Sequence, residues 1–130
     1  MYCDGASRGN PGDASIGVIA YRDSKKDQVV FTISQAIGKE TNNVAEWTSL
    51  LSALKKSLEL SEREAVIHMD SELVVKQMKG IYKTKHPDLI EIKKKVDALK
   101  NDFINLEFTH IPREKNKEAD KLANQALDSK

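Results

Sequence analysis

The hydrophobic pattern changes its period near Thr41, and this change constrains the fold more than any other feature of the sequence. Before it, an apolar run at 16–21 and alternating apolar residues at 29–33 predict strands joined by the polar segment 23–28. After it, an amphipathic helix is predicted by a stripe at helical spacing, formed by Val44, Trp47, Leu51, Leu54 and Leu58. The early part of the chain is therefore β-structure with antiparallel pairing.

Short strands and helices alternate over the rest of the chain. Strands are predicted at 65–69 and 104–110, and helices begin at Asp70-Ser71, at Pro87 and at Lys115. The segment 4–12, with three glycines and a proline, is predicted to be a loop after a very short first strand. The order β-β-β-α-β-α-α-β-α predicts an α/β fold, a mixed sheet with helices on its faces.

Composition excludes several classes of protein. The chain has 130 residues, 21 Lys plus Arg against 20 Asp plus Glu, and a net charge of +1, which excludes a strongly basic coat or an acidic tail. We expect one domain over residues 1–130, a monomer without a membrane span or secretory signal. A single cysteine, Cys3, is interpreted as a core residue, and the default location is the cytoplasm.

Four carboxylates stand at positions that structure alone does not require: Asp4, Glu46, Asp70 and Asp120. Each has an ordinary explanation by itself. Asp70 suits a helix N-cap, Glu46 a solvated helix face, and Asp120 the surface. If the four converge, they repel one another and need a cation. Oxygen ligands without cysteine favour Mg²⁺ or Mn²⁺.

Four blocks of sequence carry these acids in a recognisable order. They are DGASRGNPG at 4–12, TNNVAE at 41–46, MDS at 69–71 and HIPREKNKEAD at 110–120. Together they resemble type 1 ribonuclease H, in the compact archaeal-like form that lacks a basic protrusion. The resemblance implies a five-stranded mixed sheet whose first three strands are antiparallel.

The resemblance also implies an activity, which is metal-dependent cleavage of the RNA strand of RNA–DNA hybrids to leave 5′-phosphate and 3′-hydroxyl ends. The four acids would hold two Mg²⁺ ions, with Mn²⁺ as a substitute, and His110 would assist proton transfer and product release. The residues that would contact the hybrid are Ser7, Gly9, Asn10, Lys39, Thr41, Asn42, Asn43, Ser71 and His86. Of these, Asn10 also suits a turn and Asn42 a helix start.

Two other functions stay open from the sequence. One is a catalytically weak module that binds hybrids or double-stranded RNA, and the other is the isolated ribonuclease H domain of a reverse transcriptase. A stretch from Lys76 to Lys100 holds eight lysines against three acids, so it is a phosphate-binding face or a merely solvated one.

Overall fold

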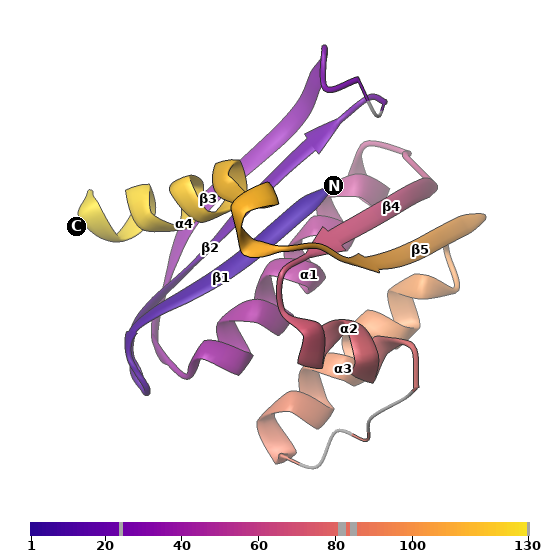
Figure 1. The fold of residues 1–130 in the computed structure, drawn as a ribbon. Helices are drawn as coiled ribbons and strands as arrows, with labels where there is room; N and C mark the ends of the chain where they lie inside the picture. The colour runs from indigo at the N-terminus through magenta and orange to yellow at the C-terminus, as the bar shows by residue number, and fades with distance from the viewer. Residues whose placement is uncertain (24, 81–82, 84–85, 130) are drawn as a thin grey trace.

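Five strands form one sheet in the order β3-β2-β1-β4-β5 (Figure 1). The computed structural model describes residues 1–23, 25–80, 83 and 86–129. The strands are β1 (Tyr2–Gly9), β2 (Gly12–Tyr21), β3 (Val29–Glu40), β4 (Glu64–Met69) and β5 (Asn105–His110). β1, β2 and β3 pair antiparallel, and β4 pairs parallel with both β1 and β5. The expected five-stranded mixed sheet is confirmed.

Helices cover both faces of this sheet. They are α1 (Asn42–Glu59), α2 (Glu72–Met78), α3 (Pro87–Lys100) and α4 (Lys117–Asp128), with a 3₁₀ turn at Arg113–Lys115. α1 packs on β1 and β2, and α3 packs on α1, whereas α4 lies across β1, β2 and β3 on the opposite face (Figure 1). The expected order of elements and the placement of helices on both faces are therefore confirmed.

The core lies between the sheet and α1. Trp47, Leu50 and Leu54 of α1 are fully buried there together with Cys3 of β1 and Ile67 of β4. The indole Nε1 of Trp47 donates a hydrogen bond to Gln77 Oε1 at 3.1 Å, so its polar atom is satisfied inside the core. The interpretation of Cys3 as a core residue is confirmed.

The first strand was expected to be very short, and this expectation is wrong. β1 runs from Tyr2 to Gly9, so it includes most of the glycine-rich segment, and Asp4 lies within the strand instead of at its end. The reason is pairing: every residue of β1 has a partner in β2, from Tyr2 opposite Ile19 to Gly9 opposite Gly12. Ladder hydrogen bonds therefore outweigh the weak strand preference of glycine.

Two glycines let helices lie directly against strands. A Cβ atom on Gly5 of β1 would be 2.2 Å from the carbonyl carbon of Ala45 in α1. A Cβ atom on Gly17 of β2 would be 2.1 Å from the carbonyl oxygen of Ala119 in α4. Both helices thus approach the sheet more closely than any side chain allows.

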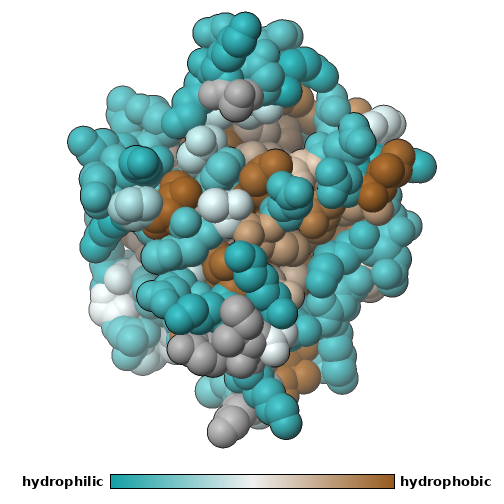
Figure 2. All heavy atoms as spheres, turned by 45° about the vertical axis from the view of Figure 1, so that its right-hand side comes forward, coloured by the Kyte–Doolittle hydropathy of each residue, from teal (hydrophilic) through white to brown (hydrophobic). Residues whose placement is uncertain are grey.

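The surface is largely hydrophilic. Figure 2 shows hydrophobic side chains in the middle of one face, surrounded by hydrophilic ones. Among the described residues, large hydrophobic side chains are exposed at Val29, Leu60, Val66, Leu73 and Ile104. Within this described part of the chain, no helix has the length and apolar character needed to cross a membrane.

A candidate metal centre at the edge of the sheet

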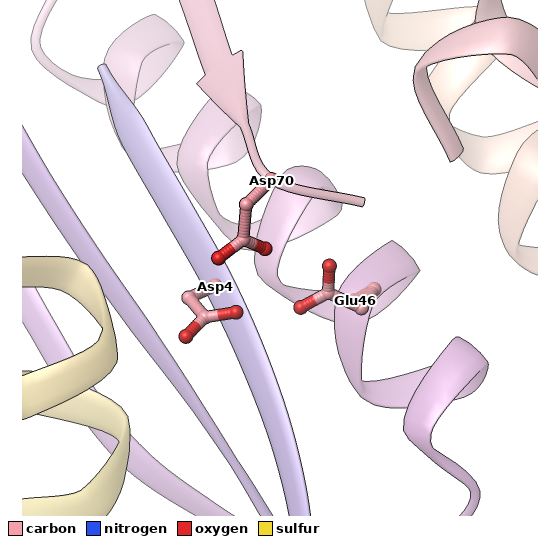
Figure 3. A group of neighbouring side chains, drawn as sticks. All are labelled: Asp4, Glu46 and Asp70. Atoms are coloured by element: carbon pink, nitrogen blue, oxygen red, sulfur yellow. The ribbon is translucent and has the colours of Figure 1, made fainter. Parts of the chain in front are cut away.

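Three carboxylates from three different elements point toward one another (Figure 3). Asp4 comes from β1, Glu46 from α1, and Asp70 from the residue that follows β4. One oxygen from each can be chosen so that all three lie within 4.8 Å of one another. The structure thus brings together three of the four acids that the sequence singled out.

The parallel pairing of β1 with β4 places Asp4 beside Asp70. The last residue pair of this ladder is Cys3 with Met69, so the next residue of each chain is an acid at the same edge of the sheet. Asp70 was also considered as a helix N-cap, but Ser71 takes that role, because its hydroxyl accepts from the Val74 N–H. Asp70 is therefore not needed to cap α2.

Glu46 reaches the site because α1 lies so close to β1. Thr41 caps this helix by accepting from the Val44 N–H at 3.2 Å, which fixes where the first turn starts. The Gly5 N–H donates a hydrogen bond to Glu46 Oε1. Glu46 is only 4% exposed, so the alternative of a solvated helix residue is wrong.

Burial dominates the electrostatics of the three acids. Desolvation raises the pKa of Asp4, and the neighbouring Glu46 and Asp70 carboxylates raise it further. Desolvation also raises the pKa of Glu46, although its hydrogen bonds with Asp4 and Gly5 oppose this effect. The pKa of Asp70 is raised by the same cause. A cluster of carboxylates with raised pKa values favours a cation that replaces the protons.

Asp120 lies at the margin of the cluster. It stands in the first turns of α4, and α4 passes beside Asp4 (Figure 3). A hydrogen bond with Asp120 contributes to the raised pKa of Asp4, and the Asp120 charge contributes to that of Asp70. Asp120 is half-buried and does not belong to the group within 4.8 Å. Asp120 therefore acts on the acids from a half-buried position.

Two further residues of the last block act on the acids, and neither was predicted from the sequence to be a site residue. The positive charge of Arg113 opposes the rise in pKa at Asp70 and Glu46. Asn116 is 1% exposed, donates to the Cys3 carbonyl oxygen at 2.8 Å and hydrogen-bonds to Asp70. In the sequence, the only indication that they belong to the site is their position between His110 and Asp120.

His110 ends β5, opposite Met69 in the ladder with β4. The next residue, Ile111, donates its N–H to the Met69 carbonyl oxygen at 2.9 Å. His110 is therefore held one residue from Asp70 across the ladder, and its side chain is exposed. This is a position from which a histidine can reach a substrate beside the acids.

Several of the predicted hybrid-binding residues meet where β1 turns into β2. The Asn10 side chain accepts from the Asn42 N–H at 3.1 Å, which ties this turn to the start of α1. The Ser7 hydroxyl donates to the Glu40 or the Gly9 carbonyl oxygen. Gly9 has φ +119°, a left-handed backbone that glycine adopts without strain. The structure thus places Ser7, Gly9, Asn10, Thr41 and Asn42 in one group.

The other predicted binding residues lie around this group or apart from it. Lys39 is exposed near the end of β3, and Asn43 is exposed in the first turn of α1. Ser71 follows Asp70 directly. His86 stands apart at the start of α3, where its Nδ1 accepts from the Asp88 N–H at 3.3 Å.

The lysine-rich stretch is partly neutralised within its own helices. Lys76 pairs with Glu72 at 2.5 Å, and Asp97 pairs with Lys93 at 2.7 Å and with Lys100 at 3.9 Å. Lys94 and Lys95 are exposed, and Lys85 is outside the described residues. A phosphate-binding role for this stretch stays a prediction.

Comparison with known proteins places the chain in a family. Residues 2–126 match the family described as reverse transcriptase-like. A protein of Mycobacterium tuberculosis described as bifunctional is 43% identical over 99% of this chain, which spans 35% of that relative. Ribonuclease HI of Halobacterium salinarum is 39% identical over 98% of this chain, which spans 63% of that protein. The chain thus covers less than two thirds of the length of each.

A solved RNase H1 structure is also similar to this chain in sequence and in fold. The crystal structure of the LC11 RNase H1 in complex with an RNA/DNA hybrid superposes with a TM-score of 0.91, at 45% identity over 98% of this chain and 95% of that one. The mixed sheet with acids at one edge defines the ribonuclease H-like class of α/β proteins. Within the reverse transcriptase-like family, the chain belongs to the type 1 ribonuclease H proteins.

Proposed function

We propose that this protein is a metal-dependent endoribonuclease that cleaves the RNA strand of RNA–DNA hybrids. The observation that carries the proposal is the convergence of Asp4, Glu46 and Asp70 within 4.8 Å on a ribonuclease H fold. The LC11 relative, whose structure was solved with an RNA/DNA hybrid, supports the choice of substrate. The activity needs no covalent nucleophile from the protein.

The donor set fits divalent magnesium. The ligands are carboxylate oxygens alone, and their raised pKa values mean that a cation relieves their repulsion. Asp4, Glu46 and Asp70 would hold the ions, with Asp120 completing the set from α4; Mn²⁺ is a possible substitute. Two ions held there would supply activation of a water and charge stabilisation at the leaving 3′ oxygen, and the expected products would carry 5′-phosphate and 3′-hydroxyl ends.

The chain's own residues would position the hybrid. The backbone of the turn at Ser7, Gly9 and Asn10, with Asn42 and Asn43, would contact 2′-hydroxyl groups in the minor groove. A phosphate of the DNA strand would be bound by Lys39 and Thr41, with Ser71 next to the acids, and His86 at the start of α3 would make a separate contact with the hybrid. His110 would transfer a proton and assist product release from its exposed position beside Asp70.

The domain organisation and location are also part of the proposal. We infer that residues 1–130 act as one ribonuclease H domain and as a monomer in the cytoplasm. The fully buried thiol of Cys3 supports a protein that functions with its cysteine reduced.

Cleavage of end-labelled RNA tests the proposal. The substrates are an RNA–DNA hybrid, single-stranded RNA, double-stranded RNA and duplex DNA, each with Mg²⁺, with Mn²⁺ and with EDTA. We expect metal-dependent cleavage of the hybrid's RNA strand only. Asp70→Asn should abolish cleavage but retain hybrid binding. Asp102→Asn, which changes an exposed acid in the turn after α3, should leave cleavage normal.

The same assay separates the alternative function. If the folded wild-type protein binds the hybrid but cuts it with neither metal, the proposal is wrong and the chain is a binding module.

A further inference from the structure

A hollow of about 390 Å³ lies on the α4 side of the sheet. Tyr2 of β1 and His68 of β4 line it, and each stands two residues before an acid, Asp4 and Asp70 respectively. Residues two apart in a strand share a face and are about 7 Å apart along it. The hollow is therefore the direct neighbour of the metal centre, and Asn116 lines it at the start of α4.

Aromatic rings form one wall of the hollow. The rings of Tyr2 and His68 stack with their centroids 4.4 Å apart and an interplanar angle of 17°. Tyr21 meets the Tyr2 ring edge-on at 5.9 Å. The Nζ atom of Lys26 lies over the Tyr2 ring, 4.3 Å from its centroid. Because Lys26 is exposed, it can move away and leave this ring to another flat group.

The hollow also holds polar atoms without partners. Among the described residues, two buried side-chain atoms have no hydrogen-bond partner, namely His68 Nδ1 and Asn116 Oδ1, and both residues line this hollow. Asn116 is 1% exposed, and its Nδ2 already donates to the Cys3 carbonyl oxygen. A buried amide oxygen without a donor is costly, so it favours a ligand that brings an N–H or O–H group.

The first turn of α4 makes the hollow favourable for an anion. Asn116 is the N-cap of α4 but makes no side-chain capping bond, and the first N–H groups of a helix lack partners inside it. The positive end of the helix dipole also lies at the start of α4, where it attracts an anion. Lys26, Lys115 and Lys117 line the hollow, against Glu114 and Glu118.

We propose that this hollow binds a nucleotide, with the base against the Tyr2–His68 stack and the phosphate toward the start of α4. A nucleobase is flat and carries N–H groups, so it suits both the rings and the unpartnered Asn116 oxygen. A phosphate suits the helix start and the three lysines. The nucleotide is either free or part of a single strand, which share this chemistry. The proposal is independent of the cleavage activity.

Nuclear magnetic resonance of the ¹⁵N-labelled chain tests whether a nucleotide binds in the hollow. EDTA is present throughout, so that no metal ion can bring the nucleotide to the acids. The probes are adenosine 5′-monophosphate, adenosine, inorganic phosphate and a short oligoadenylate. We expect the amide signals of Thr109, Ile111 and Ala119 to shift with adenosine monophosphate, with a Kd of about 1 mM or tighter. Adenosine and phosphate should each bind more weakly.

Variants locate the binding. Tyr2→Leu should weaken binding about fivefold or more, since stacking on an aromatic ring contributes that much per base. Lys26→Ala should weaken binding of adenosine monophosphate but not of adenosine, because Lys26 is one of the three lysines offered to the phosphate. Lys25→Ala is the matched control, because Lys25 is a neighbouring exposed lysine that does not line the hollow. Lys26→Ala removes no buried group, so it keeps the test valid if Tyr2→Leu unfolds.

Each outcome decides the proposal. Tighter binding of the oligoadenylate than of the mononucleotide identifies a single strand as the ligand, and equal binding identifies a free nucleotide. If no signal near the hollow shifts, or if inorganic phosphate shifts the same signals as strongly as the nucleotide, the proposal is overturned. Equal loss of binding in Lys25→Ala also overturns it.

Discussion

Asp4 lies inside a buried strand with a second carboxylate against it. Burial and the charges of Glu46 and Asp70 raise the pKa of Asp4. At neutral pH, this side chain therefore destabilises the metal-free folded state. We expect Asp4→Asn to raise the free energy of unfolding in EDTA at about pH 8 by on the order of 2 kcal/mol. The same variant should lose cleavage, because it removes a metal ligand. Urea unfolding measures the first effect, and a less stable variant would contradict it.

Arg113 is the cation that faces the acids from the last block. Its charge opposes the rise in pKa at Asp70 and at Glu46. Removing it in Arg113→Ala should therefore shift the pH midpoint of metal binding upward, by about half a pH unit for so exposed a group. Calorimetric titration with Mg²⁺ across pH measures the shift. Arg63→Ala is the control, since Arg63 lies at the start of β4, away from the acids; an unmoved midpoint in Arg113→Ala would refute the role.

For single residues, the sequence predicted the acids of the site better than it predicted the residues that contact them. Asp4, Glu46 and Asp70 were identifiable because each stands in its own recognisable block. The contributions of Arg113 and Asn116 could not be read from the same blocks. They depend on the 3₁₀ turn at Arg113–Lys115 and on the entry of α4, which local pattern does not determine.

The close contact between β2 and α4 determines where Asp120 lies. A Cβ atom at Gly17 would be 2.1 Å from the Ala119 carbonyl oxygen and 2.5 Å from the Ala123 nitrogen. We expect Gly17→Ala to push α4 off the sheet, with a loss of stability of about 3 kcal/mol and weaker Mg²⁺ binding. Thermal unfolding and metal titration measure both effects.

Gly80→Ala provides the matched control. Gly80 has φ +78° and open space around its Cα, so alanine there meets only backbone strain of about 1 kcal/mol. Its Mg²⁺ affinity should be unchanged. Equal effects of the two substitutions would show that the contact with α4 is unimportant.

Element types were predictable from the sequence, and their bounds were less so. Thr41 and Pro87 mark helix starts by local chemistry, and the structure confirms both. β1 and β3 are longer than their hydrophobic patterns, because β2 lies between them and pairs with both along its length. Pairing across the sheet is a non-local interaction, and no window of sequence contains it.

The whole molecule should respond to pH in the opposite sense to most proteins. Asp4, Glu46 and Asp70 all have raised pKa values in the folded state. The native state therefore binds more protons than the unfolded state above about pH 4, and stability falls as pH rises through the folded pKa values. In EDTA, we expect this contribution of the three acids to lower the melting temperature between about pH 5 and pH 8, although the lowered pKa values of His68 and of the N-terminal amine act in the opposite sense.

Magnesium should reverse this trend. The ion replaces the protons on the same oxygens, so its stabilising effect should be larger at pH 8 than at pH 5. Melting curves at several Mg²⁺ concentrations measure the difference. A melting temperature that rises with pH in EDTA would contradict the assigned shifts.

The acids at residues 4, 46, 70 and 120 have a consequence for synthesis. α4 comes after the elements that carry the other three acids, and it brings Asp120 toward the site while covering the sheet. During translation, the ribosome still encloses this helix after the first three acids have emerged. A nascent chain therefore holds an incomplete set of acids beside the messenger RNA that encodes it, until α4 has emerged and packed on the sheet.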